Sequence, residues 1–439
     1  MPPKVLVVGA GGREHALVRQ MAASSRKPEI FAAPGNPGTA VHATNVDLDP
    51  MDSVAVTDFC QRNNIDLVVV GPEDPLINGL ADHLHRAGIS VFGPGAMGAR
   101  LEGDKEFAKE VLTAAGVPTA HYQAFSSSDQ ALKHLDTAEL PIVVKACGAA
   151  QGKGVAVCST RDEAEVHIRA CLDDQTFGQS GLRILLEDCM FGPELSVLIV
   201  TDGQDYCLLA PSRDHKRIGE GDKGPNTGGM GAFAPVDLPE DLMAEIDTRF
   251  VLPVLAELRR RDIPYRGVLY AGLMLTDNGP SVLEFNCRFG DPETQVVLPL
   301  LTGDLYELCQ AAADGALGAY LQGLHAPAAG APAVWTGAGL TDWSRHAIVV
   351  VGASDGYPGS YAKGKPIELP ASEGEDRWMI QAGTASLEGT LVTDGGRVLG
   401  AVGTGSDLAA ARSAAYALLD ETHFEGLTYR RDIAGSEGA

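Results

Sequence analysis

Short apolar runs alternate with amphipathic stretches through the N-terminal part of the chain. The apolar runs at residues 4–8, 29–33, 65–70 and 89–92 have the length of strands, and turns rich in Gly and Pro follow them. Residues 13–22, between the first two runs, show the spacing of a helix. Strands and helices that alternate in this order predict a doubly wound parallel sheet.

The middle of the chain changes character at a helix predicted over residues 101–115, which carries Lys105 and Lys109. A compact α+β unit should follow, with helices near 128–137 and 161–173 and strands at 142–145, 183–187 and 195–201. Residues 212–231 then form a polar, Gly-rich segment with almost no apolar side chain. This composition predicts a long loop that is either functional or disordered.

The C-terminal part of the chain begins with an Ala-, Gly- and Pro-rich stretch, residues 315–333, that is typical of a linker. Beyond it, strands are predicted at 347–351, 378–382, 389–393 and 397–404, and a helix at 407–421. We therefore expect three domains, at residues 1–103, 104–325 and 326–439, with a subdomain at about 121–194 inside the second.

Composition and charge narrow the classes of function. The formal net charge of −24 argues against nucleic acid and anionic membranes as partners, because both bind basic surfaces. No apolar run approaches about 18 residues and no signal sequence is evident, so we expect a cytoplasmic protein without a membrane span. The eight cysteines include no C-x-x-C pair, which favours buried free thiols over zinc ligands. A monomer is the default expectation.

The Gly-rich turn after the first strand suggests a dinucleotide site, but the sequence opposes that interpretation. Gly9 and Gly11 match G-x-G, whereas Glu14 occupies the position of the third glycine. The strand at 29–33 ends in Ala-Pro rather than in the acidic residue that would bind a ribose. What remains is a turn rich in N–H groups at a helix N-terminus, which suits a single phosphate.

A second Gly-rich stretch, PIVVKACGAAQGKGV at residues 141–155, predicts a site for a polyphosphate. Lys145 lies on the predicted strand and Lys153 in the loop after it. Glycines in this loop would let backbone N–H groups approach an anion while the two lysines neutralise it. The loop is not of the Walker A type, because glycine rather than Ser or Thr follows Lys153. A solvated surface turn is the alternative for this stretch taken alone.

A carboxylate and an amide, Glu284 and Asn286, share one face of a predicted strand, since side chains alternate along a strand. Hard oxygen ligands of this kind suit Mg²⁺ whose other ligands are nucleotide phosphates. The sequence contains neither G-x-S-x-G nor H-E-x-x-H. The lysine strand, the Gly-rich loop and the metal strand together favour phosphoryl transfer by positioning and charge neutralisation.

Longer motifs extend over the whole chain. They include VLVVGAGGREHAL (5–17), APGNPGTA (33–40), GPEDPLINGLAD (71–82), DHKR (214–217), GPNTGGMGAFAP (224–235), LEFNCRFGDPETQ (283–295) and VTDGGRVL (392–399). In these motifs and their order the chain resembles the phosphoribosylamine–glycine ligase (glycinamide ribonucleotide synthetase) family of ATP-grasp enzymes. The DHKR, GPNTGGMG and EFNCRFGDPETQ motifs make the resemblance highly specific.

The resemblance implies an N-terminal Rossmann-like domain that binds the phosphosugar, an ATP-grasp core with an α+β lid, and a small C-terminal α+β domain. It implies the ATP-dependent ligation of glycine to 5-phosphoribosylamine in de novo purine biosynthesis. The products would be glycinamide ribonucleotide, ADP and phosphate, formed through a glycyl phosphate intermediate. Mg²⁺ or Mn²⁺ is the implied metal.

The resemblance also implies roles for individual residues. The implied ATP-binding residues are Lys105, Lys145, Gly152, Lys153, Gly154, Glu187 at the adenine and Glu194 at the ribose. The implied metal ligands are Glu284 and Asn286, and the implied phosphosugar-binding residues are Gly11, Gly12, Arg13, Asn36 and Glu73. Asp214, Lys216 and Arg288 are the candidates for the glycine and acyl-phosphate region, where the ligand's charges require both acidic and basic groups.

The chain departs from the usual family motifs at several positions. Cys147 replaces an Asp in the lid loop, Asp104 replaces a Ser before the first lysine, and Gln381 replaces a His in the C-terminal domain. These departures leave two alternatives open. One is a paralogue that ligates a different amino acid or amine in a specialised pathway, and the other is a catalytically silent nucleotide-binding homologue.

Overall fold

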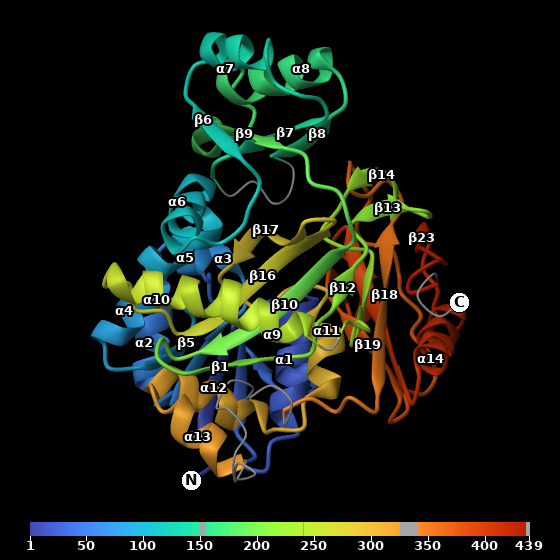
Figure 1. The fold of residues 1–439 in the computed structure, drawn as a ribbon. Coiled ribbons are helices and arrows are strands. Elements are labelled where there is room, and N and C mark those ends of the chain that lie inside the picture. The colour runs from blue at the N-terminus through green and yellow to red at the C-terminus, as the bar shows by residue number, and fades with distance from the viewer. Residues whose placement is uncertain (149–153, 240, 325–339, 436–439) are drawn as a thin grey trace.

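The structure, a computed structural model, describes residues 1–148, 154–239, 241–324 and 340–435. Its N-terminal part is a five-stranded parallel sheet in the order β3-β2-β1-β4-β5 (Figure 1). The strands are β1 (Lys4–Gly9), β2 (Glu29–Pro34), β3 (Thr44–Asn45), β4 (Leu67–Val70) and β5 (Ser90–Phe92), and the helices are α1 (Gly12–Ala22), α2 (Ser53–Asn63), α3 (Glu73–Ile77), α4 (Leu80–Arg86) and α5 (Ala96–Gly103).

Both faces of this sheet are buried. Successive residues of β1 alternate between two hydrophobic clusters, with Val5 in one and Leu6 in the other. Alternation between two cores requires cover on both faces, which the connecting helices provide. The predicted fold class, with a doubly wound sheet at the N-terminus, is confirmed.

The prediction of one helix over residues 101–115 is wrong in one respect, because the helix is interrupted at Asp104. Helix α5 ends at Gly103 and α6 (Lys105–Ala115) begins immediately afterwards. Asp104 has an extended backbone, and its side chain accepts a hydrogen bond from Phe107 N at 3.1 Å. This is the geometry of an N-cap, which satisfies a donor that the start of a helix leaves free.

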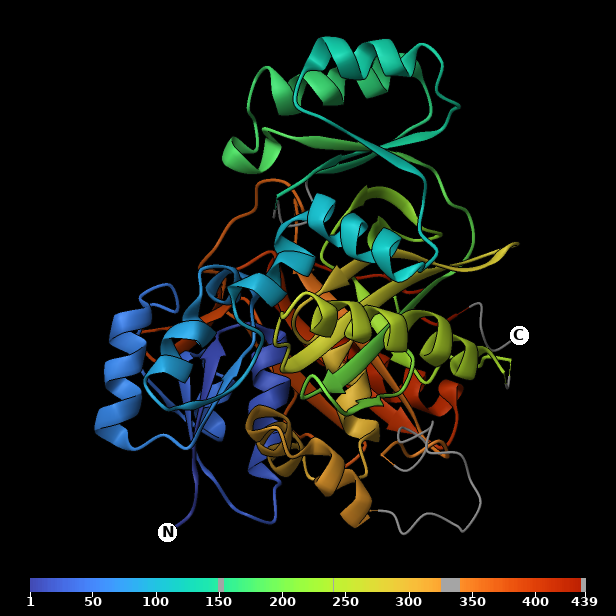
Figure 2. The ribbon, with the colours of Figure 1, turned by 60° about the vertical axis from the view of Figure 1, so that its left-hand side comes forward.

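The lid subdomain stands above the rest of the molecule in both ribbon views (Figures 1 and 2). Its antiparallel sheet has the order β6-β9-β7-β8. The elements are β6 (Tyr122–Phe125), α7 (Ser128–Leu135), β7 (Ile142–Ala146), β8 (Val155–Cys158), α8 (Arg161–Leu172) and β9 (Ile184–Asp188). Helices α7 and α8 cover the outer face of the sheet and share with it a hydrophobic core separate from those of the body. The sheet therefore faces the body with its uncovered side.

The body is built on a second antiparallel sheet in the order β11-β10-β16-β17. Its elements are β10 (Glu194–Thr201), β11 (Tyr206–Leu208), α9 (Leu242–Ile246), α10 (Leu252–Arg260), β16 (Gly267–Thr276), β17 (Gly279–Asn286), α11 (Thr294–Val297), α12 (Leu305–Asp314) and α13 (Leu317–Leu324). Among the described residues, no helix is long and apolar enough to cross a membrane.

The linker predicted at residues 315–333 is wrong in its first part, where the chain forms helix α13. Leu317 and Leu321, one turn apart, are buried against the body. The stretch was predicted as a linker from its Ala- and Gly-rich composition. Its two leucines at helical spacing are nevertheless enough to pack a short helix against the body. The remainder of the predicted linker lies outside the described residues.

The C-terminal sheet has the order β12-β15-β18-β22-β19, and β23 pairs with β18. Its strands are β12 (Arg213–Asp214), β15 (Gly231–Ala234), β18 (His346–Ser354), β19 (Arg377–Gln381), β22 (Arg397–Gly405) and β23 (Leu427–Thr428), and β20 (Thr384–Leu387) and β21 (Thr390–Thr393) form a separate hairpin. Helix α14 (Leu408–Asp420) covers one face of this sheet (Figure 1).

The polar segment 212–231 is ordered, contrary to the predicted loop. Two of its short strands, β13 (Arg217–Gly219) and β14 (Lys223–Asn226), form a hairpin, and the C-terminal tail holds this hairpin. Arg430 donates to Asp222 Oδ1 at 2.7 Å and to Arg217 O at 3.0 Å, while Asp432 accepts from Gly221 N at 2.8 Å. Charged partners from a distant segment replace the apolar contacts that the segment lacks.

The cysteine prediction is confirmed in the main. All eight cysteines are free, and seven are buried. Cys189, between β9 and β10, is only half-buried. Burial raises the pKa of the Cys147 and Cys207 thiols to about 12, so both are protonated at neutral pH.

Two histidines, His15 buried and His215 half-buried, join distant segments. His15 Nδ1 accepts a hydrogen bond from Gln381 N at 2.9 Å, which links α1 to the C-terminal sheet. His215 Nε2 accepts from Ala434 N in the C-terminal tail at 3.3 Å. Burial lowers the pKa of each histidine to about 4, because a charged imidazolium would lose its hydration.

Acid is therefore expected to destabilise the fold below pH 6.5. Unfolded histidines take up protons near pH 6.5 and the folded ones near pH 4, so the unfolded state binds more protons between these values. The free energy of unfolding should therefore fall as the pH is lowered from 6.5 to 4, by at most about 3 kcal/mol for each histidine. Urea denaturation at a series of pH values measures the slope. His15→Asn should flatten it, and His83→Asn, at an exposed histidine, should not. An unchanged slope in His15→Asn would contradict the assignment.

Candidate functional site

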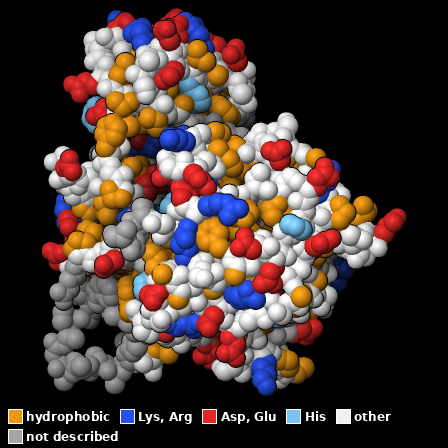
Figure 3. All heavy atoms as spheres, turned by 90° about the vertical axis from the view of Figure 1, so that its right-hand side faces the viewer, with side chains coloured by type: hydrophobic (Ala, Val, Ile, Leu, Met, Phe, Trp, Pro, Cys, Tyr) orange, Lys and Arg blue, Asp and Glu red, His pale blue; other side chains and the backbone are white. Residues whose placement is uncertain are grey.

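Acidic and basic side chains gather in a hollow where the lid meets the body (Figure 3). Two of the predicted nucleotide-binding lysines lie at this junction. Lys105, the first residue of α6, donates to Gly148 O at the end of the lid strand β7, at 3.1 Å. Lys145 Nζ, on β7 itself, lies 2.9 Å from Glu187 Oε2 and donates to Leu283 O of β17 at 3.3 Å. Both lysines therefore bridge the lid and the body.

Glu187 ends the buried part of β9 and is itself buried. Its Oε1 atom has no hydrogen-bond partner among the described residues. Glu194, at the start of β10, lies with Oε2 2.7 Å from Lys216 Nζ. The structure thus brings Glu187 and Glu194 to the same junction as the lysines.

The predicted flap over the phosphates is described only in part. Gly152 and Lys153 lie outside the described residues. Gly154 is described, and its carbonyl oxygen accepts a hydrogen bond from Ala146 N at 2.7 Å. This contact fixes the backbone where the lid loop rejoins β8.

Glu284 is surrounded by positive charge. Its carboxylate lies 3.8 Å from Lys216 Nζ, and its side chain is 41% exposed. Burial acts to raise the pKa of Glu284, but Lys216, Lys145, Lys105 and Arg288 together hold it below its usual value. The four cations come from four different segments of the chain, so the fold concentrates positive charge around this one carboxylate.

Asp214 and Lys216, on and just after β12, interact with the carboxylates of the site. Burial raises the pKa of Asp214 to about 8, and Glu293, Glu194 and Glu284 act in the same direction against Lys216. Burial acts to lower the pKa of Lys216, but Asp214, Glu194 and Glu284 raise it well above its usual value. Asp214 Oδ1 is buried without a hydrogen-bond partner among the described residues. A buried acceptor oxygen of this kind suits a ligand that brings its own N–H donors.

The metal ligands predicted on β17 meet the requirement of a hard cation. Glu284 pairs with Gly272 of β16 and Asn286 with Tyr270, and both side chains are half-buried on the same face of the strand. The described residues contain no cluster of three His, Cys, Asp or Glu side chains that could hold a metal ion by themselves. One carboxylate and one amide fit Mg²⁺, which takes its remaining ligands from phosphates and water.

Arg288 holds two carboxylates at once. Its Nε atom lies 3.1 Å from Glu73 Oε2, and Nη2 lies 2.9 Å from Glu102 Oε1. Glu102 also accepts a hydrogen bond from Cys287 N at 2.8 Å. Burial acts to lower the pKa of Arg288, but the two carboxylates raise it. Glu102 was not among the predicted site residues, because no local sequence pattern distinguishes it from a surface carboxylate.

The predicted phosphosugar residues are largely bonded within the protein. Gly11 N donates to Glu14 Oε2 at 2.5 Å, and Arg13 donates to Glu14 Oε1 at 2.6 Å and to Phe289 O at 3.0 Å. Asn36 Nδ2 donates to Ala10 O at 2.8 Å. Gly11 N, which was predicted to bind a phosphate, is therefore already hydrogen-bonded to Glu14.

Gly12 and Glu73 complete that set. A side chain at Gly12 would come within 2.9 Å of the Gln295 side chain and 3.4 Å of Ile380, so the turn packs closely against the C-terminal sheet. Glu73 is paired with Arg288. Because Arg13 donates to the carbonyl next to Arg288, the two groups are adjacent rather than separate.

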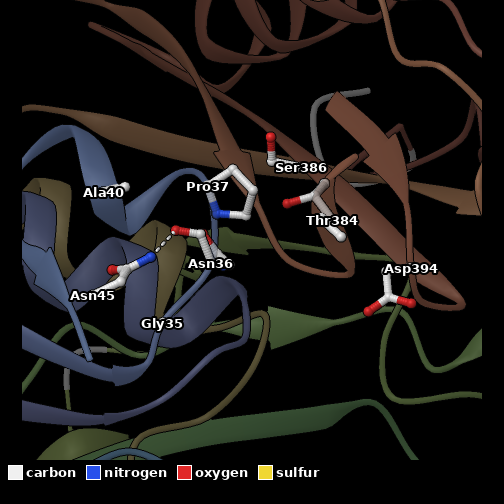
Figure 4. A pocket seen from close by; sticks show the side chains of 9 residues that line it. Gly35, Asn36, Pro37, Ala40, Asn45, Thr384, Ser386 and Asp394 are labelled. Atoms are coloured by element: carbon white, nitrogen blue, oxygen red, sulfur yellow. Dashed lines mark hydrogen bonds between the residues drawn. The ribbon is translucent and has the colours of Figure 1, made fainter. Parts of the chain in front are cut away.

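A polar pocket of about 560 Å³ lies at the seam between the N-terminal and C-terminal domains (Figure 4). It is lined by Gly35, Asn36, Pro37, Ala40, Asn45, Thr384, Ala385, Ser386 and Asp394. Asn45 donates to Asn36 O at 2.7 Å across its wall. The lining includes neither the lysines nor the metal ligands, so the candidate reaction centre lies elsewhere, at the junction of lid and body.

Three departures from the family motifs have structural explanations. Asp104 caps α6 and lies 2.8 Å from Arg100, so its charge is partly paired. Cys147 makes its contacts through the backbone, with Lys105 N donating to its carbonyl at 2.9 Å. Gln381 likewise donates to His15 through its backbone N–H, and its side-chain oxygen accepts from Thr384 at 3.2 Å. Each residue supports the fold beside the site without removing one of its charged groups.

Comparisons with known proteins match this architecture along the chain. Three family models match, described as the phosphoribosylglycinamide synthetase N domain (residues 3–102), its ATP-grasp (A) domain (103–294) and its C domain (347–436). A relative from Rhodopirellula baltica named phosphoribosylamine–glycine ligase is 44% identical, with 98% of this chain and 97% of the relative covered.

Solved structures agree. The crystal structure of a phosphoribosylamine–glycine ligase from Thermotoga maritima superposes with a TM-score of 0.82 at 32% identity, over 98% of this chain and 100% of that one. A biotin carboxylase domain from Hydrogenobacter thermophilus, solved with MgADP and bicarbonate, gives a TM-score of 0.72 at 17% identity, over 97% and 91% of the two chains. The second likeness concerns the fold alone.

Proposed function

The chain belongs to the phosphoribosylglycinamide synthetase family and is an ATP-dependent ligase that joins glycine to 5-phosphoribosylamine, and from this premise we propose which residues carry each step. The observation that supports the assignment most strongly is the meeting of Lys105 and Lys145 at the junction of lid and body, where Lys145 donates to Leu283 O and Lys216 lies 3.8 Å from Glu284. A reaction that passes a phosphoryl group from ATP to a carboxylate needs positive charge concentrated at one point.

The nucleotide lies between the lid and the body. Lys105 and Lys145 hold its phosphates, and the loop that includes Gly152, Lys153 and Gly154 covers them. Glu187, with its unpartnered oxygen, receives the adenine, and Glu194 receives the ribose. The bridging positions of the two lysines support this assignment, because a nucleotide bound there would contact both lid and body.

Glu284 and Asn286 hold the divalent metal, which is Mg²⁺ or Mn²⁺ and neutralises phosphate charge when bound. Lys216 and Arg288 stabilise the negative charge that develops as the glycine carboxylate is phosphorylated. Asp214, whose Oδ1 is buried and has no hydrogen-bond partner among the described residues, accepts N–H groups of the amino substrate. A glycyl phosphate held among these residues is the species that the sugar amine attacks.

The phosphosugar enters from the side of the N-terminal domain, at Gly11, Gly12, Arg13, Asn36 and Glu73. The adjacency of Arg13 to the Arg288 segment supports this direction of entry. The domains span residues 1–103, 104–325, with the lid at about 121–194, and 326–439. The free, mostly buried cysteines favour the reducing cytoplasm, and the enzyme acts as a monomer.

ADP release by the purified protein tests the substrates. With ATP, Mg²⁺ and freshly generated 5-phosphoribosylamine, release should depend on glycine and on the amine together, and other amino acids should not replace glycine. Release with a different amino acid or amine would favour a paralogous activity. Detectable ATP binding without release in any pairing would favour a silent homologue and contradict the assigned roles.

A further inference from the structure

Lys109 is a buried lysine that the assigned roles leave unused. It lies one turn beyond Lys105 on α6, and its side chain is 4% exposed. Its ammonium group donates to Thr119 Oγ1 at 2.7 Å, is 3.4 Å from Ala120 O, and lies 3.2 Å from Glu187 Oε2. An ammonium group has three donors, and three protein acceptors stand within reach of this one. Lys109 is thus committed to the protein rather than to a ligand.

The contact with Glu187 has a consequence for hydrogen bonding. Two ammonium groups, of Lys109 and Lys145, share Oε2 of this carboxylate, at 3.2 and 2.9 Å. The other oxygen, Oε1, is buried without a partner among the described residues. A buried carboxylate oxygen without a donor is unfavourable, so the site is arranged for a ligand that supplies an N–H group. The exocyclic amine of adenine is such a donor, and the carbonyl oxygen of guanine at the same position is not.

The contact also changes the balance of charge. Glu187 with Lys145 alone would form a neutral pair, and Lys145 would have little charge to offer a phosphate. Lys109 adds a second ammonium to the same carboxylate, so the three groups together carry one unit of positive charge. That excess charge faces the nucleotide through Lys145, which is the lysine on the lid strand.

The anchor of Lys109 reaches the metal strand. Thr119 Oγ1, which accepts from Lys109, donates to Val282 O of β17 at 2.7 Å. Lys109 therefore ties α6 to β9 of the lid and, through Thr119, to the strand that carries Glu284. A displacement of this lysine would therefore shift both Glu187 and the strand that carries Glu284.

We propose that Lys109 is a positioning residue for the nucleotide, which fixes Glu187 to receive the adenine amine and leaves Lys145 with charge for the phosphates. The proposal rests on the proposed nucleotide site. It makes Lys109 a determinant of adenine over guanine that touches neither base nor phosphate.

Dissociation constants for ADP and GDP, measured by calorimetry on the full chain, test this role. Lys109→Met should weaken ADP about tenfold or more and weaken GDP less, so the ratio between them should fall. Lys109→Arg, which keeps the charge, should recover part of that ratio. Lys133→Met, at an exposed lysine of the lid, is the matched control and should leave both constants unchanged. Far-UV circular dichroism and the melting temperature report whether each variant folds.

The possible outcomes separate the inference from the function on which it rests. A folded Lys109→Met protein with the wild-type ratio would overturn the inference, even though wild-type ADP binding remained. Wild-type protein without ADP binding would instead contradict the proposed nucleotide site. If Lys109→Met does not fold, Thr119→Val removes the anchor alone, and it too should lower the ratio; an unchanged ratio there would also overturn the inference.

Discussion

Glu284→Gln is expected to reduce turnover at saturating ATP and glycine about a hundredfold or more, the loss seen when one preorganised electrostatic group is removed. The substitution keeps the shape of the side chain and removes the charge that four cations surround. The Mg²⁺ concentration for half-maximal rate should rise as well, because an amide is a weaker ligand than a carboxylate for a hard cation. Steady-state ADP release over a series of Mg²⁺ concentrations measures both effects.

The same variant should fold normally. The Glu284 side chain is 41% exposed, so solvent screens its ion pairs and their loss should change the free energy of unfolding by no more than about 1 kcal/mol. Glu139→Gln, at an exposed carboxylate of the lid, provides the control and should change neither turnover nor stability. Wild-type turnover and Mg²⁺ dependence in Glu284→Gln would refute the ligand assignment.

The sequence predicted those parts of the molecule that local spacing determines. Strand β17 was predicted with Glu284 and Asn286 on one face, because alternation along a strand is a property of neighbouring residues. The other strands and helices that were predicted lie within a few residues of their predicted places for the same reason. The exception among the predicted helices is the one over residues 101–115. Asp104 was taken for a helix residue because its capping role depends on its backbone angles.

Pairings between distant segments could not be predicted. Glu102 meets Arg288 and Lys109 meets Glu187 only after the chain has folded, and a single sequence gives no sign of which lysine or carboxylate will be buried. The hairpin at β13 and β14 was expected as a loop because its partner, Arg430, comes from the other end of the chain. At the first Gly-rich turn, Glu14 was seen as a missing glycine and not as the acceptor of Gly11 N.

Arg288→Met is expected to lower the free energy of unfolding at pH 7 by up to about 3 kcal/mol, because it leaves the half-buried carboxylates of Glu73 and Glu102 without their arginine partner. Turnover should fall at the same time, since Arg288 is assigned to the acyl phosphate. Arg169→Met, which breaks two exposed ion pairs on α8, is the control and should change stability by less than about 1 kcal/mol.

The pH dependence of this destabilisation has a defined sign. Arg288 acts to lower the pKa of both carboxylates, so its removal raises both pKa values and the folded variant takes up more protons on acidification than the folded wild type does. The difference in unfolding free energy between wild type and Arg288→Met should therefore shrink as the pH falls from 7 to 5. Urea denaturation at both pH values measures it, and a difference that stays constant or grows would contradict the pairing.

A second substitution separates the structural role of Arg288 from its catalytic role. Glu102→Gln in the Arg288→Met background replaces a half-buried charge that has lost its arginine with a neutral amide that can still accept from Cys287 N, so stability should rise above that of the single variant. If Arg288 acts on the acyl phosphate, turnover stays low in the double variant although the fold has recovered. If Arg288 serves only to neutralise Glu102 and Glu73, turnover returns with stability, and the arginine has no place in the chemistry.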